Sequence, residues 1–182
     1  MRSGISREAS QVTHLTGLGI SGAAAIAGAV SAALEGADTD QALEKALDLS
    51  AQGASRGSWI AGASFPARVR AFRAPLRALE PAARDEFLRD VVGTSAQSQE
   101  SVVAALLLVD LGREDPFGAL CTAASLGGDT DTVAAMAGAV LGALHGTDVF
   151  PPAMTAQVRE VNGLDLAPLA EELLALRRRT TA

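Results

Sequence analysis

Two carboxylates and two hydroxyls follow a pair of glycines in the segment Gly127–Thr132, which reads Gly-Gly-Asp-Thr-Asp-Thr. Glycine lets the backbone turn so that neighbouring side chains converge, and carboxylate and hydroxyl oxygens are ligands that suit Mg²⁺. An apolar run follows, so the segment also suits a helix start, where Asp and Thr are preferred caps. Capping needs one such residue and four are present, so the segment predicts either a metal site or a helix cap.

A second polar group, Ser10-Gln11-Val12-Thr13-His14, precedes a stretch rich in Gly and Ala. A neutral histidine binds metal, moves protons or donates to a ligand oxygen. The alternative for His14 is a half-buried side chain that bonds a nearby carbonyl. The other histidine, His145, ends an expected helix, where the helix dipole accounts for it.

The chain has 182 residues, of which 48% are hydrophobic and only 3% aromatic. This length suits one domain, and an Ala-rich, aromatic-poor composition favours helices over strands. The net charge of −6 argues against a nucleic-acid partner. A single cysteine, Cys121, excludes an internal disulfide framework and a Cys-based zinc cluster. It fits a reducing, cytoplasmic location.

The sequence predicts a compact all-α bundle of seven or eight helices in a single domain, residues 1–182. No run alternates as a strand does. Leu15–Leu34 carries no charge for twenty residues and is long enough to span a bilayer. Its Ala, Gly, Ser and Thr content instead predicts two closely packed helices and no membrane partner. The expected helices cover Gly19–Leu34, Gln41–Ala51, Ala67–Leu79, Pro81–Val91, Ser101–Leu111, Pro116–Ser125, Thr132–Leu144 and Leu166–Arg178.

Several single residues have both a structural and a functional interpretation. Trp59, in a loop rich in Gly and Ser, either stacks on an adenine or packs its own loop. Glu100 is expected to cap a helix. One basic segment has four arginines that either bind a phosphate or form a solvated helix face. These are Arg68, Arg70, Arg73 and Arg77.

These motifs, taken in order, resemble the ADP-ribosylglycohydrolase family, which includes ADP-ribosyl hydrolases and dinitrogenase reductase-activating glycohydrolase-like proteins. Thr13-His14 before a small-residue helix resembles the middle of such a domain, and Ser101–Ala105 resembles a later helix. Gly127–Gly146 is very close to the family's C-terminal signature. The resemblance runs along nearly the whole chain and corresponds to the middle and C-terminal part of the family domain.

The resemblance implies an all-α fold with two Mg²⁺ ions in a central cleft. It also implies hydrolysis of an N- or O-glycosidic bond at the anomeric carbon of ADP-ribose, carried by a protein or a small molecule. Such metals orient ribose hydroxyls or water and offset developing charge, and the transition state resembles an oxocarbenium ion. By this resemblance the metal ligands are Asp129, Asp131 and Thr132. His14, Gly127 and Gly128 would bind the substrate, and no catalytic residue is assigned.

The family's early Thr-Asp-Asp motif, which completes the two-metal site, is not in this sequence. Three oxygen ligands cannot saturate two octahedral ions. We therefore expect an N-terminally truncated bundle with weak Mg²⁺ binding and impaired hydrolysis. The alternative is a non-catalytic, crystallin-like structural or interaction module derived from the family. A truncated core exposes apolar surface, so we expect self-association or a partner chain at the small-residue faces of Gly19–Leu34 and Thr132–Leu144.

Overall fold

The computed structural model describes residues 8–181. Between Gly17 and Thr181 the chain forms nine α-helices and one short π-helical segment, and the described residues contain no strand. The all-α prediction is confirmed, with one helix more than expected, at Pro152–Asn162. The chain divides into two compact units, one ending at residue 149 and the other beginning at residue 150.

The first unit holds most of the helices, and their bounds differ from the expected ones by a few residues. α8 begins at Thr130, two residues earlier than predicted, which places Asp131 and Thr132 in its first turn. The elements of the first unit are α2 (Gly17–Ala33), α3 (Thr39–Ala54), α4 (Phe65–Ala78), α5 (Pro81–Phe87), the π-helical segment η1 (Leu88–Val92), α6 (Ser98–Leu111), α7 (Pro116–Ser125) and α8 (Thr130–His145).

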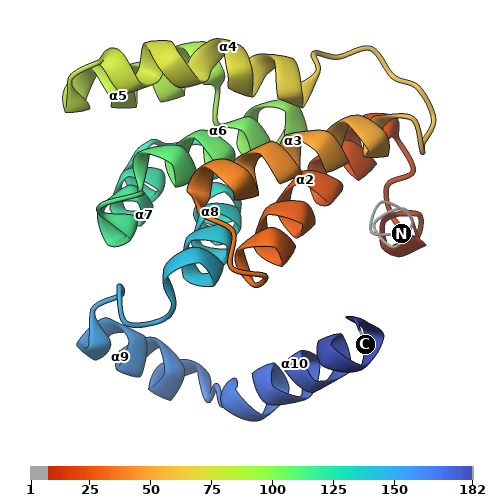
Figure 1. Ribbon diagram of the computed structural model, residues 1–182. Helices are drawn as coiled ribbons and strands as arrows, with labels where there is room; N and C mark the ends of the chain where they lie inside the picture. The colour runs from red at the N-terminus through yellow and green to blue at the C-terminus, as the bar shows by residue number, and fades with distance from the viewer. Residues whose placement is uncertain (1–7, 182) are drawn as a thin grey trace. The chain divides into compact units, whose positions relative to one another are not determined.

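Helix α6 is the centre of the first unit. Every residue from Ser101 to Asp110 is buried, as expected for a helix that is apolar on nearly all sides. Helices α2, α4, α7 and α8 all pack against it (Figure 1). The surrounding core consists mainly of Ala, Val and Leu side chains, and Phe65 is its one fully buried aromatic residue. The aromatic-poor composition is thus realised as an aliphatic core.

Helices α2 and α3 form the most closely packed pair. A Cβ at Gly28 would lie only 2.7 Å from the Leu49 Cδ1 atom, and the buried Ser21 hydroxyl donates to the Ser50 carbonyl oxygen at 2.9 Å. The small residues of Leu15–Leu34 therefore serve close helix packing, as predicted. No described helix combines the length and apolar character needed to span a membrane.

Helix α3 covers much of the small-residue face of Gly19–Leu34 within the chain, and self-association through the expected faces stays a prediction. Helix α3 is set in place by a capping box, in which Asp38 accepts from the Gln41 amide at 2.8 Å. The Gln41 side chain accepts from the Asp38 amide in return at 3.1 Å.

The second unit consists of α9 (Pro152–Asn162) and α10 (Ala167–Thr181). Gly163 ends α9 in the left-handed conformation, with φ of 61°, a position that favours glycine. Both helices space apolar residues three or four apart, as amphipathic helices do.

Candidate functional site

The Gly127–Thr132 turn depends on two glycines with positive φ. Gly127 has φ of 81° and Gly128 has φ of 79°, a region that other residues rarely adopt. A Cβ at Gly128 would also lie 2.4 Å from the Thr94 carbonyl oxygen, whereas one at Gly127 would meet nothing within 4 Å. Gly128 is therefore required both for its backbone conformation and for the close approach of Thr94.

Thr94 connects this turn to the loop that precedes α6 through two hydrogen bonds. The Asp129 amide donates to the Thr94 carbonyl oxygen at 2.7 Å, and the Thr94 hydroxyl donates to the Gly127 carbonyl oxygen at 2.8 Å. Thr94 is itself buried. These two bonds bring the segments that lead into α6 and α8 together at one end of the first unit.

Asp129 occupies the N-cap position of α8, but its side chain makes no capping hydrogen bond. A capping aspartate accepts from an amide of the first helical turn, whereas Asp129 Oδ1 accepts from the Thr132 hydroxyl at 2.8 Å. Asp129 is half-buried, while Asp131 and Thr132 are exposed. Side-chain capping of α8 thus does not account for Asp129, whose carboxylate instead bonds the Thr132 side chain.

Glu100 stabilises the loop that carries Thr94. One carboxylate oxygen accepts from the Ser95 amide at 3.0 Å, and hydrogen bonds from the side chain and backbone of Ser95 lower the pKa of Glu100. Gly93, with φ of 84°, allows this, because a Cβ there would lie 2.5 Å from the Glu100 carboxylate. The predicted capping role is corrected: Glu100 bonds an amide in the preceding loop and not one in the first turn of α6.

His14 lies just before α2, on an exposed segment. Its amide donates to the Ser10 carbonyl oxygen at 2.7 Å, and a Cβ at Gly19 would lie 3.5 Å from its Cβ. Helices α2 and α8 pack against each other, but these contacts of His14 remain within its own segment. The structure therefore brings Gly127, Gly128 and Asp129 against Thr94. Thr132 contacts Asp129, and His14 lies just before a neighbouring helix.

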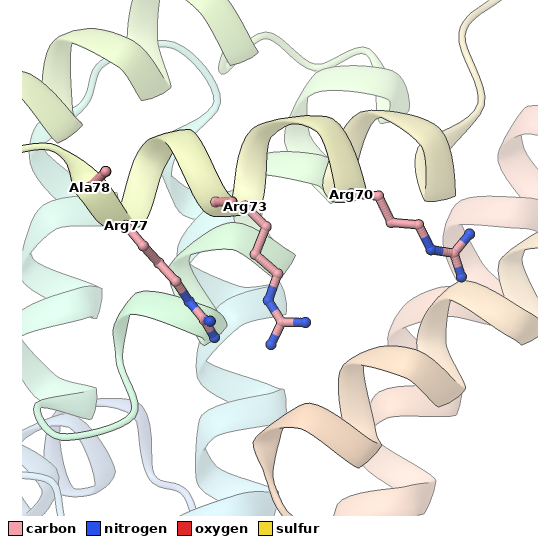
Figure 2. Close-up of a pocket in the computed structure, with 5 residues that line it drawn as sticks. Arg70, Arg73, Arg77 and Ala78 are labelled. Atoms are coloured by element: carbon pink, nitrogen blue, oxygen red, sulfur yellow. The ribbon is translucent and has the colours of Figure 1, made fainter.

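A cavity of about 550 Å³ lies elsewhere, on α4, and is lined by Arg70, Arg73, Ala74, Arg77 and Ala78. Figure 2 shows the three arginine side chains pointing from α4 toward the same side.

The arginines on the basic face of α4 have hydrogen-bond partners within the chain. Arg73 Nε donates to the Asp110 carboxylate at 2.9 Å, and Arg77 Nε donates to its other oxygen at 2.6 Å. Arg113 also donates to Asp110, at 2.7 Å. Arg68 donates to the Val92 carbonyl oxygen at 2.7 Å. Arg70 donates to the Glu44 carboxylate of α3 at 3.3 Å, so all four predicted arginines join α4 to its neighbours, a role that sequence spacing alone did not indicate.

The donor set for Mg²⁺ fits in chemical type and falls short in number. Asp129, Asp131 and Thr132 offer carboxylate and hydroxyl oxygens, which Mg²⁺ prefers, but its octahedral shell needs about six. Within residues 8–181 no three side chains of the His, Cys, Asp or Glu type are grouped so as to hold a metal ion. The acidic turn therefore offers three oxygen donors of the right type and too few to fill an octahedral shell by itself.

Comparisons with known proteins agree with the order of these motifs. The family model described as ADP-ribosylglycohydrolase matches residues 4–182, so the chain belongs to the ADP-ribosylglycohydrolase family. It is 35% identical over 175 residues to "Uncharacterized protein YegU" of Escherichia coli (strain K12). The match covers 96% of this chain and 52% of that relative, so the chain spans about half the relative's length. No solved structure matches significantly.

Proposed function

We propose that this chain takes part in hydrolysis of the glycosidic bond at the anomeric carbon of ADP-ribose in ADP-ribosylated substrates. Membership of the family supports this substrate class. The observation that carries the proposal is Asp129, a half-buried carboxylate at a helix start that makes no side-chain capping bond. Its turn is held to a second segment by Thr94.

In this proposal Asp129, Asp131 and Thr132 hold Mg²⁺. The Thr132 hydroxyl already contacts Asp129 Oδ1 at 2.8 Å, so two of the three oxygen donors lie together. Bound Mg²⁺ would orient ribose hydroxyls or water and offset the charge that develops in the transition state.

His14, Gly127 and Gly128 are proposed to bind the ADP-ribose part of the substrate. Gly127 and Gly128 have no side chains and are exposed, so a ligand can approach their peptide groups closely. His14 is exposed at the start of α2, where its imidazole is free to donate to a ligand oxygen.

The turn supplies too few oxygens for two octahedral ions, so we propose that residues 1–182 alone hydrolyse poorly or not at all. Full activity would then need ligands from a partner chain or from additional sequence. The test is release of ADP-ribose from an ADP-ribosylated protein by the purified chain with Mg²⁺. Clear turnover by this chain alone would contradict the proposed impairment.

Calorimetric titration with Mg²⁺ and ADP-ribose tests the binding role separately. We expect weak Mg²⁺ binding that Asp129→Ala and Asp131→Ala abolish. Asp48→Ala, which removes an exposed carboxylate on α3, is the matched control and should leave binding unchanged. Equal Mg²⁺ binding in all three variants would refute the metal site and favour a non-catalytic, crystallin-like module.

A further inference from the structure

Trp59 is the one exposed aromatic ring of the chain. The sequence has one Trp, no Tyr and five Phe. All five Phe residues are buried or half-buried, and Phe72 and Phe87 pack edge to face, with centroids 5.6 Å apart. Trp59, by contrast, is 85% exposed. Its predicted loop-packing role is therefore wrong, and its ring faces solvent.

The backbone beside Trp59 is fixed although its side chain is exposed. The Ser58 amide donates to the Leu15 carbonyl oxygen at 2.8 Å, and the Gly17 amide donates to the Ser58 carbonyl oxygen at 2.8 Å. A Cβ at Gly57 would lie 2.5 Å from the Thr16 carbonyl carbon, so only glycine permits this contact. The loop thus holds Trp59 firmly beside the segment that joins His14 to α2.

The same loop extends toward the acidic turn through successive contacts. A Cβ at Gly62 would lie 2.5 Å from Leu18 Cδ1 in α2 and 2.7 Å from Gln99 Nε2 in α6. The segment leading into α6 carries Thr94, which contacts the turn before α8. The Trp59 loop, the start of α2 and the acidic turn are therefore linked through the start of α6.

We propose that Trp59 is the stacking platform for the purine base of an adenine nucleotide, the base of ADP-ribose in the proposed reaction. This inference rests on the proposed function, because that function requires adenine to be bound. A flat, exposed ring offers a stacking surface for a base, and the backbone of the preceding residue, Ser58, is held by two hydrogen bonds. Among the Trp and Phe rings of this chain, Trp59 is the exposed one.

The test uses Trp59 as its own reporter, because the chain contains no other Trp and no Tyr. The full chain is titrated with ADP-ribose, ADP and ribose 5-phosphate while tryptophan fluorescence is recorded. We expect the two adenine ligands to change the emission and ribose 5-phosphate, which lacks a base, to leave it unchanged. An emission change of equal size with ribose 5-phosphate would contradict stacking.

Calorimetry with ADP-ribose then compares Trp59→Ala with Trp59→Phe. Loss of the stacked ring should weaken binding about 5- to 150-fold, whereas Phe should retain most of the affinity. Val12→Ala removes another apolar side chain, 84% exposed, and should not change binding. If ADP-ribose binds the parent chain and Trp59→Ala equally well, the inference fails while the proposed function stands.

Two further outcomes are decisive. If the parent chain binds no ADP-ribose, with or without Mg²⁺, both the inference and the proposed substrate class are overturned. If Trp59→Ala changes the oligomeric state in sedimentation while leaving ADP-ribose affinity unchanged, Trp59 belongs to a protein interface and the stacking role is refuted.

Discussion

The Asp129 amide and the Thr94 carbonyl oxygen are joined by a 2.7 Å hydrogen bond that fixes the acidic turn to the loop before α6. Gly128 precedes Asp129, and a Cβ at Gly128 would lie 2.4 Å from the same carbonyl oxygen, so any side chain there must push the two groups apart. The geometry of the candidate metal site therefore depends on a residue that carries no side chain.

Replacing Gly128 by Ala should destabilise the chain more than replacing Gly127. Both changes force a left-handed backbone on an L-residue, at a cost of about 1–2 kcal/mol. Only Gly128→Ala adds a clash with the Thr94 carbonyl, for about 1–3 kcal/mol more. Denaturant unfolding measures the difference. Equal free energies of unfolding for the two variants would show that the Thr94 carbonyl moves aside at no measurable cost.

Thr94→Val should loosen the turn without changing the shape of its side chain. The variant removes the hydrogen bond to the Gly127 carbonyl oxygen, which is worth about 1 kcal/mol, and leaves that carbonyl unpaired on the chain. We also expect weaker Mg²⁺ binding, because Asp129 would be held less firmly. Thr147→Val, at an exposed threonine after α8, serves as the control, and calorimetry measures both.

Asp110→Asn should be the most damaging of the carboxylate changes. Asp110 is 3% exposed and is bonded by Arg73, Arg77 and Arg113. Neutralising a buried partner leaves guanidinium charge uncompensated, and such losses cost about 3–5 kcal/mol. Asp40→Asn is the matched comparison: its carboxylate also meets Arg113, but its side chain is 58% exposed.

We expect Asp40→Asn to cost at most about 1 kcal/mol, as exposed ion pairs do. Thermal unfolding of both variants at neutral pH makes the comparison. Similar melting temperatures for the two variants would mean that the ion pairs of buried Asp110 stabilise the fold no more than those of exposed Asp40.

The same cluster predicts loss of stability in acid. Burial alone would raise the pKa of Asp110, but hydrogen bonds from the three arginines outweigh it and leave this pKa below its ordinary value. Hydrogen bonding to Arg113, followed by the contact with Arg73, lowers the pKa of Asp40. A carboxyl whose folded pKa is depressed stabilises the fold above its unfolded pKa of about 3.9 and loses that contribution as pH falls.

The melting temperature should therefore change little through this cluster between about pH 7 and pH 5 and fall below about pH 4. In Asp110→Asn the acid decline should be shallower, because one of the titrating groups is gone. If the melting temperature of that variant falls just as steeply in acid, the loss of stability comes from other carboxyls.

Local sequence signals predicted much of the fold. The apolar run at Ser101–Leu111 predicted a buried helix, and the structure has one there. The acidic turn was visible because glycines, carboxylates and hydroxyls stand in one short stretch. What local signals left out was long-range pairing.

Thr94, Asp110 and Arg113 act through partners on other elements of the chain. The apolar run around Asp110 indicated burial, but nothing near the three residues in sequence names their partners. Their roles follow from burial and tertiary hydrogen bonds, which only the folded chain defines. Trp59 shows the opposite case: its residue type suggested burial, and its exposure in the structure reversed that interpretation.

The contact of Gly28 with Leu49 has a consequence for how the first helix pair forms. Alanine and glycine have no rotamers to lose, so joining α2 to α3 through such residues freezes little side-chain motion. The pair gains close backbone approach and dispersion contact at low entropic cost. Because the two helices are so close, larger side chains at the α2–α3 contact would be poorly tolerated. Substitutions there should therefore favour small side chains over large ones during evolution.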